Sequence, residues 1–99
     1  MSEDNTIPEE LEAALAESRE RLAEAPADMV VANHAMGLYE LAAIHLTSLP
    51  PRLPEAALAI DAVACLVDGL GDRLGEHHEI LATALATIRM AYVDLARKP

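Results

Sequence analysis

Four histidines are the side chains in this sequence best able to hold a metal ion, and their spacing decides whether they can share one. His34 and His45 are eleven residues apart, which on one helix separates them by about 16 Å along the axis. His77 and His78 are adjacent, so they would point about 100° apart. Because no HExxH or Glu-x-x-His pair occurs, the sequence predicts structural or solvated histidines and no metal site. A site assembled from several helices or subunits is the alternative.

The one cysteine, Cys65, is the next candidate for chemistry. It stands in the middle of a predicted helix between apolar neighbours, where a buried small side chain is expected. A nucleophile would need a base and positive surroundings, whereas the nearby charges are Asp61 and Asp68. These aspartates are two turns and about 10 Å apart on a helix, too far for a pair of catalytic carboxylates, so a solvated edge is expected. We therefore predict no catalytic residue.

Three glycines could suggest a loop that cradles phosphate. Gly69, Gly71 and Gly75 have the spacing GxGxxxG, which is not the dinucleotide fingerprint, and no strand is expected before them. We expect these glycines to end helices, and we predict no bound cofactor.

Three methionines offer a different kind of surface. Met29, Met36 and Met90 could line an adaptable peptide groove, because thioethers pack against varied shapes. Ordinary filling of the core is the favoured interpretation.

Composition favours helices and disfavours several classes of partner. Of the 99 residues, 53% are hydrophobic but only 2% aromatic, so the residues that line most substrate pockets are nearly missing. A formal charge of -10 would repel nucleic acid and anionic membranes. Apolar runs such as Leu41–Leu46 are far shorter than the roughly 20 residues of a membrane span, and the acidic start Met1–Asn5 is unlike a secretory signal. With a single cysteine, these features indicate a soluble, cytoplasmic protein.

The first predicted helix begins with the capping box Thr6-Ile7-Pro8-Glu9, in which Thr6 is the N-cap. It should run to about Ala25, and Pro26 closes it. Its apolar residues form a narrow seam, so it must lie on the surface of the rest, pack on a second copy, or fray. The seam consists of Ile7, Leu11, Leu15 and Leu22.

Two helices are expected in the middle of the chain. Asp28 is a suitable N-cap for a helix over 29–49, which Pro50 stops. Apolar residues occur on more than one face of that helix, so we expect burial on two sides. Leu53-Pro54-Glu55 starts the next helix, which a glycine ends near Leu70. Its acidic, solvated edge is formed by Glu55, Asp61 and Asp68.

A fourth helix should run from about Glu76 to roughly Arg97. Its apolar residues alternate at four- and three-residue steps, the spacing of a seam packed against neighbouring helices. Arg89 lies beside this seam, so we expect it to pair with a carboxylate of a neighbouring helix, with Asp61 or Asp68 the first candidates. The seam consists of Leu81, Leu85, Ile88, Tyr92 and Leu95.

These elements predict an all-α protein, a small helical bundle of three core helices plus an N-terminal amphipathic helix. Residues 1–27 are the acidic N-terminal segment with the amphipathic helix, and residues 28–97 are the helical core domain.

The part from Met29 to Ala96 also resembles a known family. The matching residues are Leu41-Ala42-Ala43-Ile44-His45-Leu46, then Glu55-Ala56, Ile60-Asp61 and Leu66, and finally Ile88-Arg89-Met90-Ala91-Tyr92-Val93. On these residues the chain is similar to a family of small bacterial proteins classed only as a domain of unknown function, number 1844 in the usual series. It departs from that family at Gly75-Glu76-His77-His78, where relatives tend to carry glutamates. The resemblance implies a compact helical fold and carries over no catalytic residue.

The function expected from the sequence is a non-enzymatic helical protein that self-associates, as a homodimer first, and binds another protein. The motivation is that the helices over 29–49 and 53–70 carry apolar residues around most of their circumference. An enzyme or metal-binding protein, with a site formed between helices or subunits, is the alternative. Nucleic acid and membranes are not expected as partners.

Overall fold

The computed structural model describes residues 8–98, and that part of the chain is built from helices without a strand. The order is α1 (Glu9–Glu24), α2 (Ala27–Leu46), α3 (Leu53–Leu70), a short 3-10 helix η2 (Gly71–Leu74), and α4 (His77–Ala96). The predicted all-α class and small helical bundle are confirmed.

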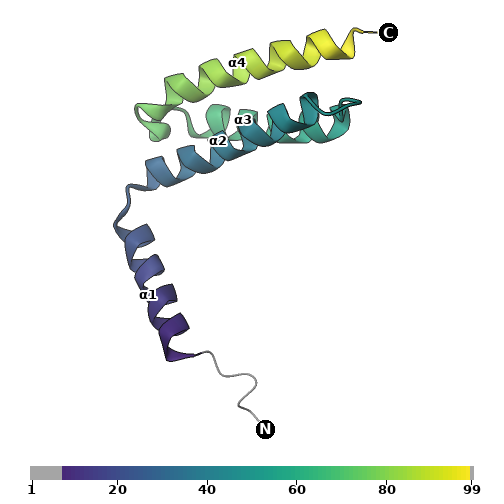
Figure 1. The fold of residues 1–99 in the computed structure, drawn as a ribbon. Coiled ribbons are helices and arrows are strands. Elements are labelled where there is room, and N and C mark those ends of the chain that lie inside the picture. The colour runs from purple at the N-terminus through teal and green to yellow at the C-terminus, as the bar shows by residue number, and fades with distance from the viewer. Residues whose placement is uncertain (1–7, 99) are drawn as a thin grey trace.

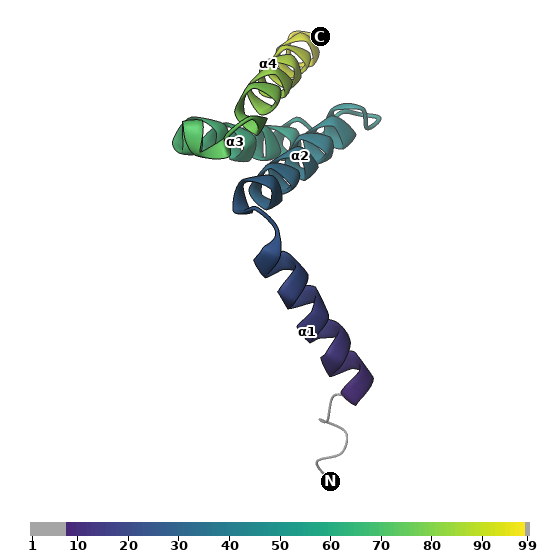
Figure 2. The ribbon, with the colours of Figure 1, turned by 90° about the vertical axis from the view of Figure 1, so that its left-hand side faces the viewer.

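Helices α2, α3 and α4 pack against one another and enclose the core, as Figures 1 and 2 show. Successive helices run in opposite directions, and α4 lies across the pair formed by α2 and α3. Leu74, Leu81 and Val63 are the largest fully buried side chains. Most buried positions of α2 and α3 that face this core are alanines, such as Ala35, Ala42 and Ala56. Because alanine is small, the helix axes can approach closely.

Helix α1 stands apart from this core. Figures 1 and 2 show it projecting away from α2, from which Ala25 and Pro26 separate it, and none of its residues is buried. Its end at Glu24 agrees with the predicted end to within one residue. The described part of α1 begins after Pro8, so the predicted N-cap, Thr6, lies outside the described residues.

The start of α2 corrects a prediction. Pro26 occupies the N-cap with φ -57° and ψ 130°, so the helix begins at Ala27 and the prediction that Asp28 is the N-cap is wrong. Proline has its φ already fixed near this value and needs no N–H partner there. Asp28 instead lies inside the first turn, where its carboxylate accepts a 2.9 Å hydrogen bond from the Met29 backbone N–H.

The end of α2 comes at Leu46, three residues before the predicted Leu49. The residue before a proline is disfavoured in the helical conformation, which removes Leu49 from the helix. The hydroxyls of Thr47 and Ser48 then donate to the carbonyls of Ala43 and Ile44, at 2.8 and 2.9 Å. The Ala43 carbonyl also accepts the Thr47 backbone N–H at 3.0 Å, so the hydroxyls add to the hydrogen bonds that close the helix end.

The prediction that the three glycines end helices is right for Gly71 and Gly75 and wrong for Gly69, which lies inside α3. Gly71 follows α3 with φ 49°, and Gly75 follows η2 with φ 60°. Side chains rarely tolerate this positive φ, so glycine ends both elements. Helix α4 then begins within one residue of the prediction, and its seam faces the core: Leu81, Leu85 and Ile88 are buried.

The second apolar side of α2 is not buried. Leu41 is exposed, and Ile44 keeps 61% of its surface accessible, so the prediction of burial on two sides is wrong for the chain as it stands. The three core helices cover only one side of α2, and α1, which could have covered the other, points away. No helix of the described residues is long and apolar enough to cross a membrane.

Candidate interaction surface

An open groove of about 440 Å³ lies between α3 and α4. Its floor is formed by Ile60, which is buried, and Tyr92, which is half-buried and packs against the core. Half-buried Ala57 and exposed Val93 also line it. Its remaining lining residues are Asp61 and Arg89. We call this surface the α3–α4 groove.

Asp61 and Arg89 line this groove but do not pair. Arg89 is exposed, and among the described residues it forms no ion pair within 4.0 Å. The prediction that Arg89 pairs with Asp61 or Asp68 is therefore wrong. The prediction assumed that Arg89 is partly buried, but Arg89 follows the buried Ile88 by about 100° around α4, which turns it toward water. An exposed ion pair would contribute only about 0 to 1 kcal/mol, so little favours its formation.

Most of the cations of the core lie at the groove end. Since α3 and α4 run in opposite directions, the start of α3 and the end of α4 lie at the same end, as Figure 1 shows. Four of the five Lys and Arg residues after α1 are found there, with four carboxylates, so this end is formally neutral. The cations are Arg52, Arg89, Arg97 and Lys98, and the carboxylates are Glu40, Glu55, Asp61 and Asp94.

The opposite end of the core is acidic. His77 Nε2 of α4 lies 4.0 Å from Asp28 Oδ2 of α2, which places the start of these two helices side by side. Five carboxylates and one arginine occupy this end. They are Asp28, Asp68, Asp72, Glu76, Glu79 and Arg73. Helix α1 is therefore attached to its own core at the acidic end.

Helix α1 presents an amphipathic surface of its own. Leu11, Leu15 and Leu22 are all exposed and recur at spacings that place them on one side of the helix. Beside Leu15, the side chains of Glu12 and Arg19 line a shallow concavity. The helix contains six glutamates and two arginines, a formal charge of -4.

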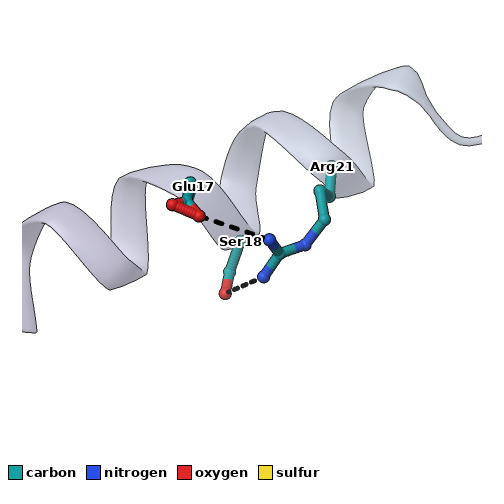
Figure 3. A network of polar contacts seen from close by, with 3 residues as sticks. All are labelled: Glu17, Ser18 and Arg21. Atoms are coloured by element: carbon teal, nitrogen blue, oxygen red, sulfur yellow. Dashed lines mark hydrogen bonds and ion pairs between the residues drawn. The ribbon is translucent and has the colours of Figure 1, made fainter.

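One of the two arginines of α1 is engaged within the helix. Figure 3 shows Arg21 reaching Glu17 at 3.5 Å and donating a hydrogen bond to the Ser18 hydroxyl at 3.5 Å. Both partners are on α1 itself and exposed, so this contact supports the helix without tying it to the core.

The histidines lie at separate places in the fold. His34 Nδ1 is 2.8 Å from the carbonyl oxygen of Val30 on the same helix, and the side chain is exposed. His77 approaches Asp28, and the half-buried His78 follows it in the first turn of α4. Within residues 8–98, no three His, Cys, Asp or Glu side chains are grouped so that they could hold a metal ion.

His45 has a different environment, near the end of α2. Its Nδ1 atom is buried and has no hydrogen-bond partner among the described residues. Its backbone carbonyl accepts a 2.9 Å bond from the Arg52 N–H and so fastens the loop that leads into α3. No carboxylate pairs with His45 in the described part of the chain.

Cys65 and two methionines are more exposed than the sequence suggested. Cys65 is exposed, so its interpretation as a buried side chain is wrong. It lies four residues after Asp61 and three before Asp68, and this helical spacing places it on the acidic edge of α3. That edge is solvated, as predicted.

The methionines divide between the core and the surface. Met36 packs against the core, as predicted, whereas Met29 and Met90 are exposed, so core filling is wrong for these two. Neither of the exposed methionines lines the α3–α4 groove.

Sequence reasoning did not find the α3–α4 groove. Its signal was present: Val93 and Arg89 are four residues apart on one face of α4, beside the seam residue Tyr92. On α3, Ala57 also lines the groove, and a larger side chain at that position would fill part of it.

Comparison with protein families, with curated proteins and with solved structures finds no match to this chain. The resemblance to the bacterial family of unknown function stays a prediction.

Proposed function

We propose that this protein is a non-enzymatic, cytoplasmic helical module that self-associates, as a homodimer first, and binds another protein. The observation that carries the proposal is the exposed leucine side of α1, a helix with no buried residue. An isolated helix of this length is marginal in water, so packing against another surface is what would hold it. Apolar residues exposed on the core, Val93 among them, supply further area that association would bury.

The charge of the chain opposes association but does not prevent it. Each copy carries a formal charge of -10, and much of it lies on α1 and at the acidic end of the core. On α2, the exposed apolar residues Leu41 and Ile44 have Glu40 as the only Asp, Glu, Lys or Arg residue within one turn. Salt screens the repulsion over a Debye length of about 8 Å at 0.15 M, while the burial of apolar surface is unaffected by this screening.

Light scattering of the full chain at micromolar concentration in moderate salt tests the proposal. A mass twice that of the 10.6 kDa chain supports self-association. A mass of one chain across the whole concentration range refutes it.

The alternative function, an enzyme or metal-binding protein, draws on the approach of His77 to Asp28 between α4 and α2. His77 and Asp28 would supply two ligands, whereas zinc sites have at least three from the protein. A second subunit would therefore have to complete such a site. Metal analysis of the purified protein distinguishes this alternative from the first proposal.

A further inference from the structure

Resting on the proposed self-association, we propose that α1 of one copy docks in the α3–α4 groove of a second copy. The contact is reciprocal, so that each copy gives its α1 and receives the other. Two observations carry this pairing: an exposed apolar helix side and an apolar groove, and a difference in charge between the two ends of the core, since most of its cations lie at the groove end and the other end is acidic.

The helix offers a continuous apolar side of suitable length. Its 16 residues span about 24 Å, and Leu11, Leu15 and Leu22 lie on one side of it without contact to the core. An amphipathic helix that lays such a side into an apolar groove is a recurrent mode of recognition, with anchors spaced by three, four or seven residues. Leu11, Leu15 and Leu22 have four- and seven-residue spacings.

The groove offers the complementary surface. Ile60, Tyr92, Val93 and Ala57 provide apolar floor and walls, and the two charges, Asp61 and Arg89, stand among them without an ion pair. Arg89 can therefore accept a carboxylate from a partner without losing one inside its own chain. A tyrosine and an arginine within one groove are also the residue types most enriched at the energetic centres of interfaces.

Charge selects the groove end of the core over the other end. Helix α1 has a formal charge of -4, while the groove end holds four cations, Arg52, Arg89, Arg97 and Lys98, beside four carboxylates and is formally neutral. The opposite end, where five carboxylates face one arginine, would repel α1. Complementary charges of this kind steer association and set the orientation of the partners.

The occupant belongs to a second copy because of where α1 is attached. Helix α1 joins its own core at the acidic end, where only Ala25 and Pro26 connect it to α2. It points away from the core in both ribbon views. The α3–α4 groove lies toward the other end of the bundle. Exchange of α1 between copies brings the acidic helix to the end that holds most of the cations of the core, without bending it back over its own acidic end.

Matched glutamate substitutions test the docking by sedimentation equilibrium. Leu15→Glu changes the donor side and Val93→Glu the groove, and both side chains are 41% exposed, so neither substitution removes a buried side chain. Arg89→Glu is a second groove variant and changes only an exposed charge. Ile44→Glu, at an exposed position of α2 outside the groove, is the control. Circular dichroism establishes that each variant keeps the helical content of the wild type.

We expect each of Leu15→Glu and Val93→Glu to weaken the dimer at least about tenfold, the size of one lost anchor, and Ile44→Glu to leave it unchanged. An equimolar mixture of Leu15→Glu and Val93→Glu should recover a heterodimer, because the intact α1 of one variant can still enter the intact groove of the other. Recovery in the mixture, with neither variant dimeric alone, supports exchange of α1.

The location of the contact is tested independently by the single cysteine. Cys65 is exposed and lies one turn from Asp61 on α3, so a benzophenone attached to it should cross-link to residues 9–24 of the other copy. A mixture of isotope-labelled and unlabelled chains distinguishes links between copies from links within one. Links confined to one chain overturn the exchange.

Failure of this inference differs from failure of the proposed function. A wild-type protein that is monomeric at all concentrations refutes both the proposed self-association and the docking of α1. A wild-type dimer that Leu15→Glu, Val93→Glu and Arg89→Glu leave intact, while Ile44→Glu disrupts it, retains self-association and places the contact on the exposed side of α2 instead.

Discussion

Asp61 on α3 and Arg89 on α4 line the same apolar groove without forming an ion pair. Such an exposed pair would contribute at most about 1 kcal/mol within the chain, so little stabilisation is lost by leaving the two charges apart. Docking of a partner helix would exclude water from the groove and strengthen any charge interaction made there. The groove therefore combines apolar area with charges that remain available to a partner.

The core should depend on Leu81 far more than on an exposed leucine. Leu81→Ala removes a side chain that is 1% exposed, and we expect it to lower the free energy of unfolding by about 3 kcal/mol through the cavity it leaves. Leu58→Ala makes the same chemical change where the side chain is 71% exposed, and should change the free energy by less than about 0.5 kcal/mol. Urea unfolding at one protein concentration measures both; equal effects would contradict the assignment of the core.

The two glycines Gly71 and Gly37 should respond to alanine in opposite directions. Gly71 has φ 49° and ψ -125°, a conformation that alanine rarely adopts, so Gly71→Ala should destabilise the fold by about 1 to 3 kcal/mol. Gly37 lies inside α2 with no atom within 4 Å of an added Cβ, so Gly37→Ala should stabilise it by up to about 1 kcal/mol. Thermal unfolding of both variants measures these effects. A shift of the melting temperature with the same sign in both variants would contradict the backbone conformations of these two glycines.

Cys65 should react with a thiol reagent in the folded protein. Its exposure on the acidic edge of α3 predicts a labelling rate in buffer within about tenfold of the rate in denaturant, since access is not blocked. The Cys65→Ser variant is the negative control and should not be labelled, because the chain has no other cysteine. Labelling that requires denaturant would show that the side chain is covered.

Metal removal should leave the protein unchanged. We expect a purified sample to contain less than one equivalent of zinc, nickel or iron per chain, measured by elemental analysis, because no pair of histidines has ligand spacing on one helix. The melting temperature should be the same with and without chelator. A melting temperature several degrees lower with chelator would favour the metal-binding alternative.

The helices and their seams could be predicted from sequence because they depend on local signals. Pro26, Pro50 and the glycine-rich turn each constrain the backbone where they stand, and the seam of α4 follows directly from the helical period. The early end of α2 was missed because Leu49 was counted by its hydrophobicity, whereas its position before Pro50 decides its conformation.

The exposed features depend on tertiary packing and were harder to predict. Burial of Cys65 was inferred from its apolar neighbours, although its spacing from Asp61 and Asp68 already placed it on the solvated edge of α3. The orientation of α1 and the groove beside Tyr92 follow from how whole helices meet. A sequence pattern identifies which side of a helix is apolar, and it does not identify which surface covers that side.

Salt should strengthen the dimer, although opposite charges meet at the proposed contact. At about 25 Å, each of the roughly 100 charge pairs between two copies of charge -10 repels by about 0.17 kcal/mol in unscreened water, or about 17 kcal/mol in total. A Debye length of about 8 Å at 0.15 M removes nearly all of this repulsion. The few exposed attractive pairs contribute at most about 1 kcal/mol each, so their loss is smaller.

Sedimentation equilibrium of the wild-type chain at low and at moderate salt is the most direct test of self-association. We predict a homodimer at micromolar concentration whose dissociation constant falls as salt rises. A protein that sediments as a single 10.6 kDa chain at every concentration and salt level would contradict the account.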